Sequence, residues 1–215
     1  MEKLLEYIVR EPIQATEQTP LLLMLHGYGS NENDLFSFAS ELPDELLIVS
    51  ARAPLSLGLN SFAWYSLQMN AQNQLVSNIP EALEARNMIL NLIDFLQRIY
   101  HFKPEKSFLL GFSQGSILSY SIALNYPEKI QNIIALSGYI NEEITPNQPN
   151  IHYKKLNFFC SHGTEDSVIP IAAARKTASL LTQLDIRHVY KEYHSGHGVS
   201  PANFTDFKNW ITSIL

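Results

Sequence analysis

Residues 107–115 read SFLLGFSQG, and residues 116–127 continue as SILSYSIALNYP. The first stretch is an apolar run of strand length, and the second has helical composition. Gly-x-Ser-x-Gly lies at their junction, where a serine in a tight turn needs glycines to leave room for crossing backbone. The stretch therefore predicts a nucleophile at Ser113. The alternative is an ordinary strand-to-helix turn that uses glycine for its flexibility.

Short apolar runs recur along the chain, and stretches with helical spacing lie between them. Most of the runs are continuous rather than alternating, as strands covered on both faces should be. They are residues 21–26, 46–51, 107–110, 132–137, 157–162 and 187–193. The helical stretches are residues 81–100, 113–125, 172–184 and a last one that begins with Ser200-Pro201 and ends near residue 214.

Alternating strands and helices predict an α/β fold with a mostly parallel central sheet, flanked by helices on both faces. We expect one domain over residues 1–215, without a separate cap domain, and an edge strand at residues 4–9. Two segments fit this pattern poorly. Residues 54–79 have no clear period, and residues 141–152 read as a surface loop.

Composition excludes several classes of protein. One cysteine, Cys160, rules out an internal disulfide. A formal charge of −6 gives no electrostatic reason to expect nucleic acid or an anionic membrane as the main partner. No stretch resembles a secretory signal or approaches the ~20 apolar residues of a membrane helix. We therefore expect a cytoplasmic protein with no stable membrane insertion.

A serine nucleophile needs a base and an acid, which follow it in the chain in the order acid, then histidine. Glu165 and Asp166 both come just after the apolar run at 157–162, and both qualify by position. His197 lies between two glycines after the last predicted strand and is the candidate base; His194 is a rival. The two histidines also allow a metal site, but no third ligand has a metal-like spacing nearby.

A second glycine-rich turn follows the first buried run, where residues 21–30 read LLLMLHGYGS. Such a loop can aim a backbone N–H at a substrate carbonyl oxygen, and Tyr28 would supply it through its main chain. The second donor would be the N–H of Gln114. Each donor of this kind is worth ~3–4 kcal/mol of transition-state stabilisation. The alternative is a plain turn in which Asn31 or Asn33 caps the next helix.

Four motifs stand together in one order: HGYG at 26–29, GFSQG at 111–115, HGTED at 162–166 followed by VIP at 168–170, and GH at 196–197. In combination they resemble the phospholipase/carboxylesterase family of α/β-hydrolases, which includes acyl-protein thioesterases and small bacterial carboxylesterases. The resemblance covers nearly the whole chain. It departs at Ser66, where aspartate often follows Trp-Tyr, at Leu110, where glycine is common, and at Tyr28, often a leucine.

The resemblance implies Ser113 as nucleophile, Asp166 as acid and His197 as base, with the main-chain N–H groups of Tyr28 and Gln114 as oxyanion hole. It also selects the second of the two adjacent acids. The implied activity is a serine hydrolase that cleaves carboxylic esters, with thioesters and lysophospholipids as its wider range. It implies no cofactor and no metal. The substrate would be a small-molecule or lipid ester or an acylated protein, and a homodimer is allowed.

The substrate region is expected in the segment without a clear period. Residues 51–67 are similar to the segment that shapes the family's substrate site. We expect residues 55–65 to form the wall of an acyl pocket, because this is a long apolar loop near the carboxyl edge of the sheet. The candidate substrate-binding residues are Leu57, Phe62, Trp64 and Tyr65. The alternative function is a catalytically silent binding protein that kept the fold.

Overall fold

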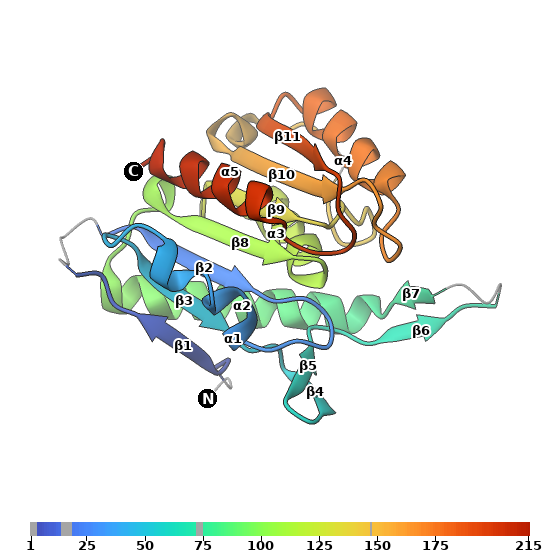
Figure 1. Cartoon of the computed structure of the whole chain (residues 1–215), viewed down its shortest axis with the longest axis horizontal. Helices are drawn as coiled ribbons and strands as arrows, with labels where there is room; N and C mark the ends of the chain where they lie inside the picture. The colour runs from blue at the N-terminus through green and yellow to red at the C-terminus, as the bar shows by residue number, and fades with distance from the viewer. Residues whose placement is uncertain (1–3, 14–18, 72–74, 147) are drawn as a thin grey trace.

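The six predicted apolar runs all form strands of one sheet in the computed structural model, which describes residues 4–13, 19–71, 75–146 and 148–215. The sheet has seven strands in the order β1-β3-β2-β8-β9-β10-β11 (Figure 1). They are β1 (Tyr7–Arg10), β2 (Leu21–Leu25), β3 (Leu47–Ala51), β8 (Phe108–Phe112), β9 (Asn132–Leu136), β10 (Asn157–Gly163) and β11 (Arg187–Tyr193). β1 pairs antiparallel with β3, and the other neighbours are parallel.

Helices cover both faces of this sheet, as predicted. One face carries α2 (Ile79–Tyr100), α3 (Gln114–Asn125) and α4 (Ile171–Gln183), and the other carries α1 (Asn33–Phe36) and α5 (Pro201–Thr212). Figure 1 shows α5 in front of the sheet and α2 behind it. The described residues also form three 3-10 helices: η1 (Ala39–Glu41), η2 (Pro104–Lys106) and η3 (Ile151–Lys155). Among the described residues, none of the helices has the length and apolar composition needed to cross a bilayer.

The side chains of one strand divide between the two cores. Leu21 and Leu23 of β2 pack into the cluster with α2 and α3, whereas Leu22 and Met24 pack into the cluster with α1 and α5. Successive residues of a strand point to opposite faces, so a strand buried on both faces is apolar at nearly every position. This is why β2 reads as a continuous apolar run.

Two helix starts follow from their sequences. The side chain of Asn78 accepts a hydrogen bond from the N–H of Glu81 at the start of α2. The hydroxyl of Ser200 accepts one from the N–H of Asn203, and Pro201 occupies the first position of α5. The predicted Ser200-Pro201 start is thus confirmed, because a capping side chain satisfies an N–H that has no partner inside the helix.

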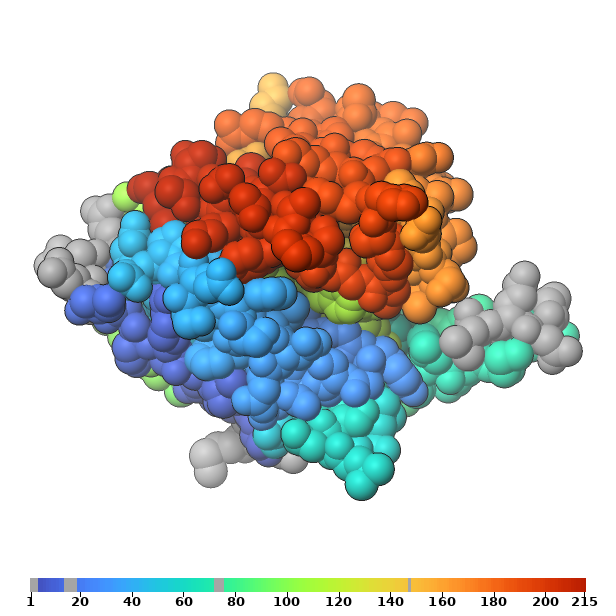
Figure 2. Space-filling view, in the orientation of Figure 1, coloured from blue at the N-terminus to red at the C-terminus, as the bar shows by residue number. Residues whose placement is uncertain are grey.

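The segment 54–79 contains two hairpins that the sequence pattern did not predict. β4 (Leu55–Gly58) pairs with β5 (Ser61–Ala63), and β6 (Leu67–Met69) pairs with β7 (Leu75–Ser77). Both project from the body of the molecule, β4–β5 at the bottom of the view and β6–β7 at the right (Figures 1 and 2). The residues between them, Trp64 and Tyr65, are buried instead.

The segment 141–152, predicted as a surface loop, is partly internal. Ile144 is buried, and its carbonyl oxygen accepts hydrogen bonds from the side chains of Arg86, Ser121 and Asn125. These donors anchor the loop to α2 and α3. The prediction was therefore wrong for this part of the segment, because its polar residues obscured one apolar anchor.

The single cysteine of the chain, Cys160, lies in β10 and is buried. The hydroxyl of Tyr120 in α3 donates a hydrogen bond to its Sγ at 3.1 Å. Burial raises the pKa of the Cys160 thiol to about 12, since a thiolate there would lack solvation. Cys160 therefore packs as a small apolar side chain.

Candidate active site

The junction of β8 and α3 is a strained turn centred on Ser113. Ser113 has φ +53° and ψ −115°, a conformation that side chains rarely adopt. A Cβ on Gly111 would lie 2.4 Å from the carbonyl oxygen of Gly115, and a Cβ on Gly115 would lie 2.1 Å from that of Leu25. No side chain fits at either position, so both glycines of the Gly-x-Ser-x-Gly pattern are required by contact with backbone.

Three side chains from separate loops meet at this turn. The Nδ1 of His197 lies 2.6 Å from Oδ2 of Asp166, and its Nε2 lies 2.9 Å from Oγ of Ser113. A carboxylate only accepts hydrogen bonds, so Nδ1 carries the proton and Nε2 accepts from the serine hydroxyl. The imidazole is thus held in the tautomer that can take the proton of Ser113.

The carboxylate of Asp166 is buried and fully hydrogen-bonded. Its Oδ1 accepts from the main-chain N–H groups of Val168 at 2.8 Å and Ile169 at 2.9 Å, while Oδ2 faces His197. Burial alone would raise the pKa of Asp166, but the bonds from His197, Ile169 and Val168 together outweigh it and lower the pKa. Asp166 is therefore ionised at neutral pH.

The two main-chain groups predicted as an oxyanion hole are available. Within the described chain, neither the N–H of Tyr28 nor that of Gln114 has a hydrogen-bond partner. The loop of Tyr28 is fixed on its far side, where the N–H of Gly29 donates to the carbonyl of Phe62 at 2.8 Å. Gln114 begins α3, so its N–H also lies at the positive end of the helix dipole.

The side chain of Gln114 joins the turn at Ser113 to the segment between the hairpins. Its Oε1 accepts from the N–H of Trp64 at 2.9 Å, and its Nε2 donates to the carbonyl of Tyr65 at 2.7 Å. The indole Nε1 of Trp64 donates in turn to the carbonyl of His26 at 2.8 Å. Three long-range hydrogen bonds thus hold the loop after β2 and the turn after β8 together.

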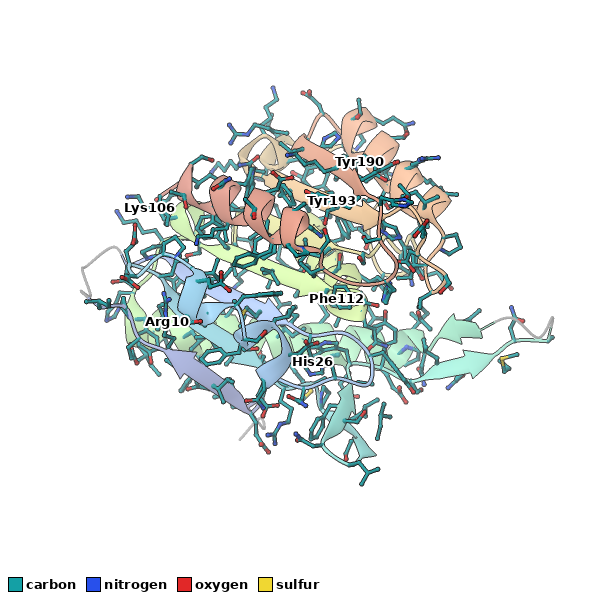
Figure 3. The ribbon with its side chains drawn as sticks, in the orientation of Figure 1. Arg10, His26, Lys106, Phe112, Tyr190 and Tyr193 are labelled. Carbon is teal, nitrogen blue, oxygen red and sulfur yellow. The ribbon has the colours of Figure 1, made fainter. Side chains whose placement is uncertain are left out.

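His26 has a structural role in this arrangement. It is fully buried, and its Nε2 accepts from the N–H of Ala53 at 3.1 Å. Burial lowers the pKa of His26, so the ring is neutral. Figure 3 shows His26 and Phe112 near the same end of the sheet, on the neighbouring strand ends of β2 and β8. His26 therefore supports the loop rather than exchanging protons with a substrate.

A cavity of about 730 Å³ lies at Ser113 and His197. Its apolar lining includes Leu67 and Val76 from the β6–β7 hairpin and Ile117 from α3. Its polar lining includes Tyr139, Asn141 and Glu143. The volume lies in the range of small-molecule sites, and the mixture of apolar walls with few polar groups is typical of them.

Comparison with known proteins identifies the family of the chain. The model of the phospholipase/carboxylesterase family matches residues 8–215. The chain belongs to this family. It is accordingly an esterase-type hydrolase with an α/β-hydrolase fold.

The esterase is similar to proteins from several sources. An acyl-protein thioesterase 1 from Emericella nidulans is 26% identical and aligns over 93% of this chain and 92% of its own. The crystal structure of esterase PE8 superposes with a TM-score of 0.84 at 23% identity, over 99% and 100% of the two chains. The Bacillus cereus carboxylesterase also gives 0.84, at 17% identity over 100% and 96%.

The candidate substrate-binding residues of the esterase lie in different places. Tyr65 lines the cavity. Leu57 is exposed on the β4–β5 hairpin, Phe62 packs against the guanidinium of Arg52, and Trp64 is fully buried beneath the loop of His26. The structure therefore brings only Tyr65 of the four to the cavity, and contact of the others with substrate stays a prediction.

The sequence also allowed His194 as the base, Glu165 as the acid and a metal site. His194 is largely exposed, with its Nε2 3.5 Å from a carboxylate oxygen of Glu165 on the protein surface. In the described parts of the chain, no three histidine, cysteine, aspartate or glutamate side chains gather closely enough to hold a metal ion. Asp166 instead faces His197, and His197 faces Ser113.

Proposed function

We propose that this esterase uses Ser113 as nucleophile, His197 as general base and acid, and Asp166 as the group that orients His197. The observation that carries the proposal is the unbroken pair of hydrogen bonds from Oδ2 of Asp166 through the imidazole to Oγ of Ser113. An imidazole held in this tautomer accepts a proton at Nε2, while the carboxylate stabilises the imidazolium that forms.

Acylation begins when Oγ of Ser113 attacks the carbonyl carbon of the ester and its proton passes to Nε2 of His197. The carbonyl oxygen becomes an oxyanion and accepts hydrogen bonds from the N–H groups of Tyr28 and Gln114. The bond to the leaving group then breaks, and His197 gives its proton to the departing alcohol or thiol. The acyl group remains on Ser113.

Deacylation repeats these steps with water. His197 takes a proton from water as the water oxygen attacks the acyl carbon, and then returns the proton to Oγ of Ser113 as the carboxylic acid leaves. Because the pKa of Asp166 is lowered, its carboxylate keeps its negative charge throughout the neutral range.

The substrate class is carboxylic esters and thioesters. Apolar side chains at Leu67, Val76 and Ile117 supply a surface for an acyl chain next to Ser113. The name of the Emericella nidulans relative, an acyl-protein thioesterase, supports thioesters of acylated proteins as substrates beside simple esters.

The test is hydrolysis of p-nitrophenyl esters and matching acyl thioesters over a series of chain lengths. We expect Ser113→Ala to lose at least about 10³-fold in kcat, as removal of a triad nucleophile does. Ser116→Ala is a matched control, because its buried hydroxyl lies in the same helix without a hydrogen-bond partner among the described residues. A chelator, added in parallel, should leave the rate unchanged.

Two outcomes would contradict the proposal. Full activity in Ser113→Ala would exclude it as the nucleophile. A folded wild-type protein inactive on every ester and thioester of the series would favour the alternative of a binding protein that kept the fold.

A further inference from the structure

A second imidazole lies beside the carboxylate of Asp166. His162 is in β10, and its side chain is completely buried. Its Nε2 lies 2.8 Å from the carbonyl oxygen of Ile169 and 3.2 Å from Oδ2 of Asp166. The carbonyl oxygen of Ile169 only accepts hydrogen bonds, so Nε2 carries a proton and donates it there, beside the carboxylate of Asp166. The proposed mechanism makes no use of this histidine.

The surroundings of His162 determine which ring nitrogen carries the hydrogen and where the ring lies. Its Nδ1 is buried and has no hydrogen-bond partner among the described residues, so a proton there would be buried without an acceptor. The adjacent charged group on β11, Glu192, is already paired with Arg175 at 2.8 Å. β10 is hydrogen-bonded to β9 and β11 on its two sides, so the donor is held on one of the most constrained strands.

The hydrogen bond of His162 reaches Asp166 through the turn that follows β10. Ile169 donates its N–H to Oδ1 of Asp166 and accepts from His162 through its carbonyl oxygen. Nε2 of His162 also lies 3.2 Å from Oδ2, the same oxygen that receives the Nδ1–H of His197. The carboxylate is therefore held at one oxygen by the turn, and its other oxygen lies between two imidazoles.

We infer that His162 is a positioning residue of the reaction. Its Nε2–H holds the carbonyl of Ile169, whose own N–H binds Oδ1 of Asp166, and so keeps the carboxylate in the geometry in which Oδ2 meets the Nδ1–H of His197. Without this donor, the carbonyl of Ile169 loses its buried partner and the carboxylate can rotate away from His197. The inference rests on the proposed function, because it requires Asp166 to act on His197.

The experiment measures kcat and KM for His162→Leu and His162→Gln, each alone and combined with Asp166→Ala. His162→Leu removes the donor, and we expect kcat to fall at least about tenfold, since small displacements of a catalytic group cost up to about 10²-fold. The amide nitrogen of Gln can occupy the place of Nε2, so His162→Gln should recover most of kcat. KM should change less than kcat in both.

The double variants separate positioning from a general structural role. A residue that acts through Asp166 has nothing left to position once Asp166→Ala is made, so adding His162→Leu should lower kcat by less than about twofold further. His188→Leu is the matched control, because this histidine of β11 donates to the carbonyl of Ile186, just before the strand, and belongs to no part of the site. Its activity per folded molecule should equal that of the wild type.

Each outcome decides the inference. Wild-type kcat in His162→Leu, with Ser113→Ala and Asp166→Ala both strongly impaired, would overturn the inference and leave the proposed function intact. An equal loss with and without Asp166 would also overturn it. Full activity in Ser113→Ala would overturn the proposed function itself. If His162→Leu does not fold, His162→Asn replaces it, because its shorter amide cannot reach Ile169.

Discussion

The turns at the carboxyl ends of the sheet strands are tightly packed, whereas the two hairpins of residues 55–77 are open to solvent. At the sheet edge, backbone contacts leave no room for a Cβ on Gly115, and the carboxylate of Asp166 is hydrogen-bonded at both oxygens. On the hairpins, a Cβ on Gly58 would meet nothing within 4 Å, and Leu59 is fully exposed. The groups that we propose to react thus lie where packing leaves little room for variation, whereas the projecting hairpins (Figure 2) can vary without disturbing the sheet.

The largest difference in stability should come from adding one methyl group to a glycine, either in the packed turns at the carboxyl ends of the strands or on a hairpin. Gly115→Ala brings Cβ to 2.1 Å from the carbonyl oxygen of Leu25. We expect the free energy of unfolding to fall by more than about 4 kcal/mol, measured by urea denaturation. Gly58→Ala has free space but φ +87°, so it should cost only about 1–2 kcal/mol. An equal loss of unfolding free energy in the two variants would show that the two regions tolerate an added side chain equally.

The next effect concerns Gln114, whose side chain joins the two regions. Gln114→Leu removes both hydrogen bonds to the main chain of Trp64 and Tyr65 but keeps the N–H of residue 114. We expect a loss of about 1–3 kcal/mol in the free energy of unfolding and a fall of about tenfold in kcat/KM. Gln97→Leu in α2 is the control, since its side chain makes one long bond of 3.5 Å. Unchanged kcat/KM in Gln114→Leu would mean that the two regions act independently.

A smaller effect should appear when only the hairpin part of the cavity is altered. Leu67→Ala and Val76→Ala each remove apolar contact from the cavity wall, and a buried methylene is worth about 0.8 kcal/mol. We expect kcat/KM for long acyl chains to fall about threefold to tenfold, with the acetyl ester and the melting temperature little changed. Met69→Ala, further along the same strand and outside the cavity lining, is the control. A uniform loss at all chain lengths would contradict the assignment.

The smallest effect should be on the charge of the substrate. Glu143 is the acidic side chain in the cavity lining, so it disfavours esters that carry a carboxylate. Glu143→Gln should raise kcat/KM for an acidic ester relative to a neutral ester of the same length by about threefold, since exposed charges are screened. Glu142→Gln is the matched control, because its carboxylate pairs with Lys176. The same rise in both variants would show a general effect of net charge.

The sequence predicted the sheet well and the hairpins poorly, for one physical reason. A strand buried on both faces is apolar at nearly every position, so five residues such as LLLML in β2 are a strong signal. β5, β6 and β7 have three residues each, and β6 is exposed throughout. Three half-exposed residues carry too little pattern to distinguish a strand from a loop.

In the candidate site, too, some features were predictable from the sequence and others were not. Chain order and glycine spacing indicated Ser113, and His197 with His194 as a rival, because these features belong to local turns. The contacts of the Gln114 side chain and of His162 depend on segments that return from elsewhere in the chain, as the carbonyl of Ile169 and the main chain at residues 64–65 do. No local spacing encodes such contacts. The one available signal was a histidine at the end of a buried strand, four residues before the acid.

The buried thiol of Cys160 makes the strand that carries His162 directly observable. A thiol with a pKa of about 12 inside the sheet reacts with a disulfide reagent only after β10 separates from its neighbours. Because the chain has a single cysteine, the labelling rate reports the opening of this one strand with no competing signal. Comparing that rate with the rate of inactivation would reveal whether the esterase loses its activity by local opening beneath Asp166 or only when the whole sheet unfolds.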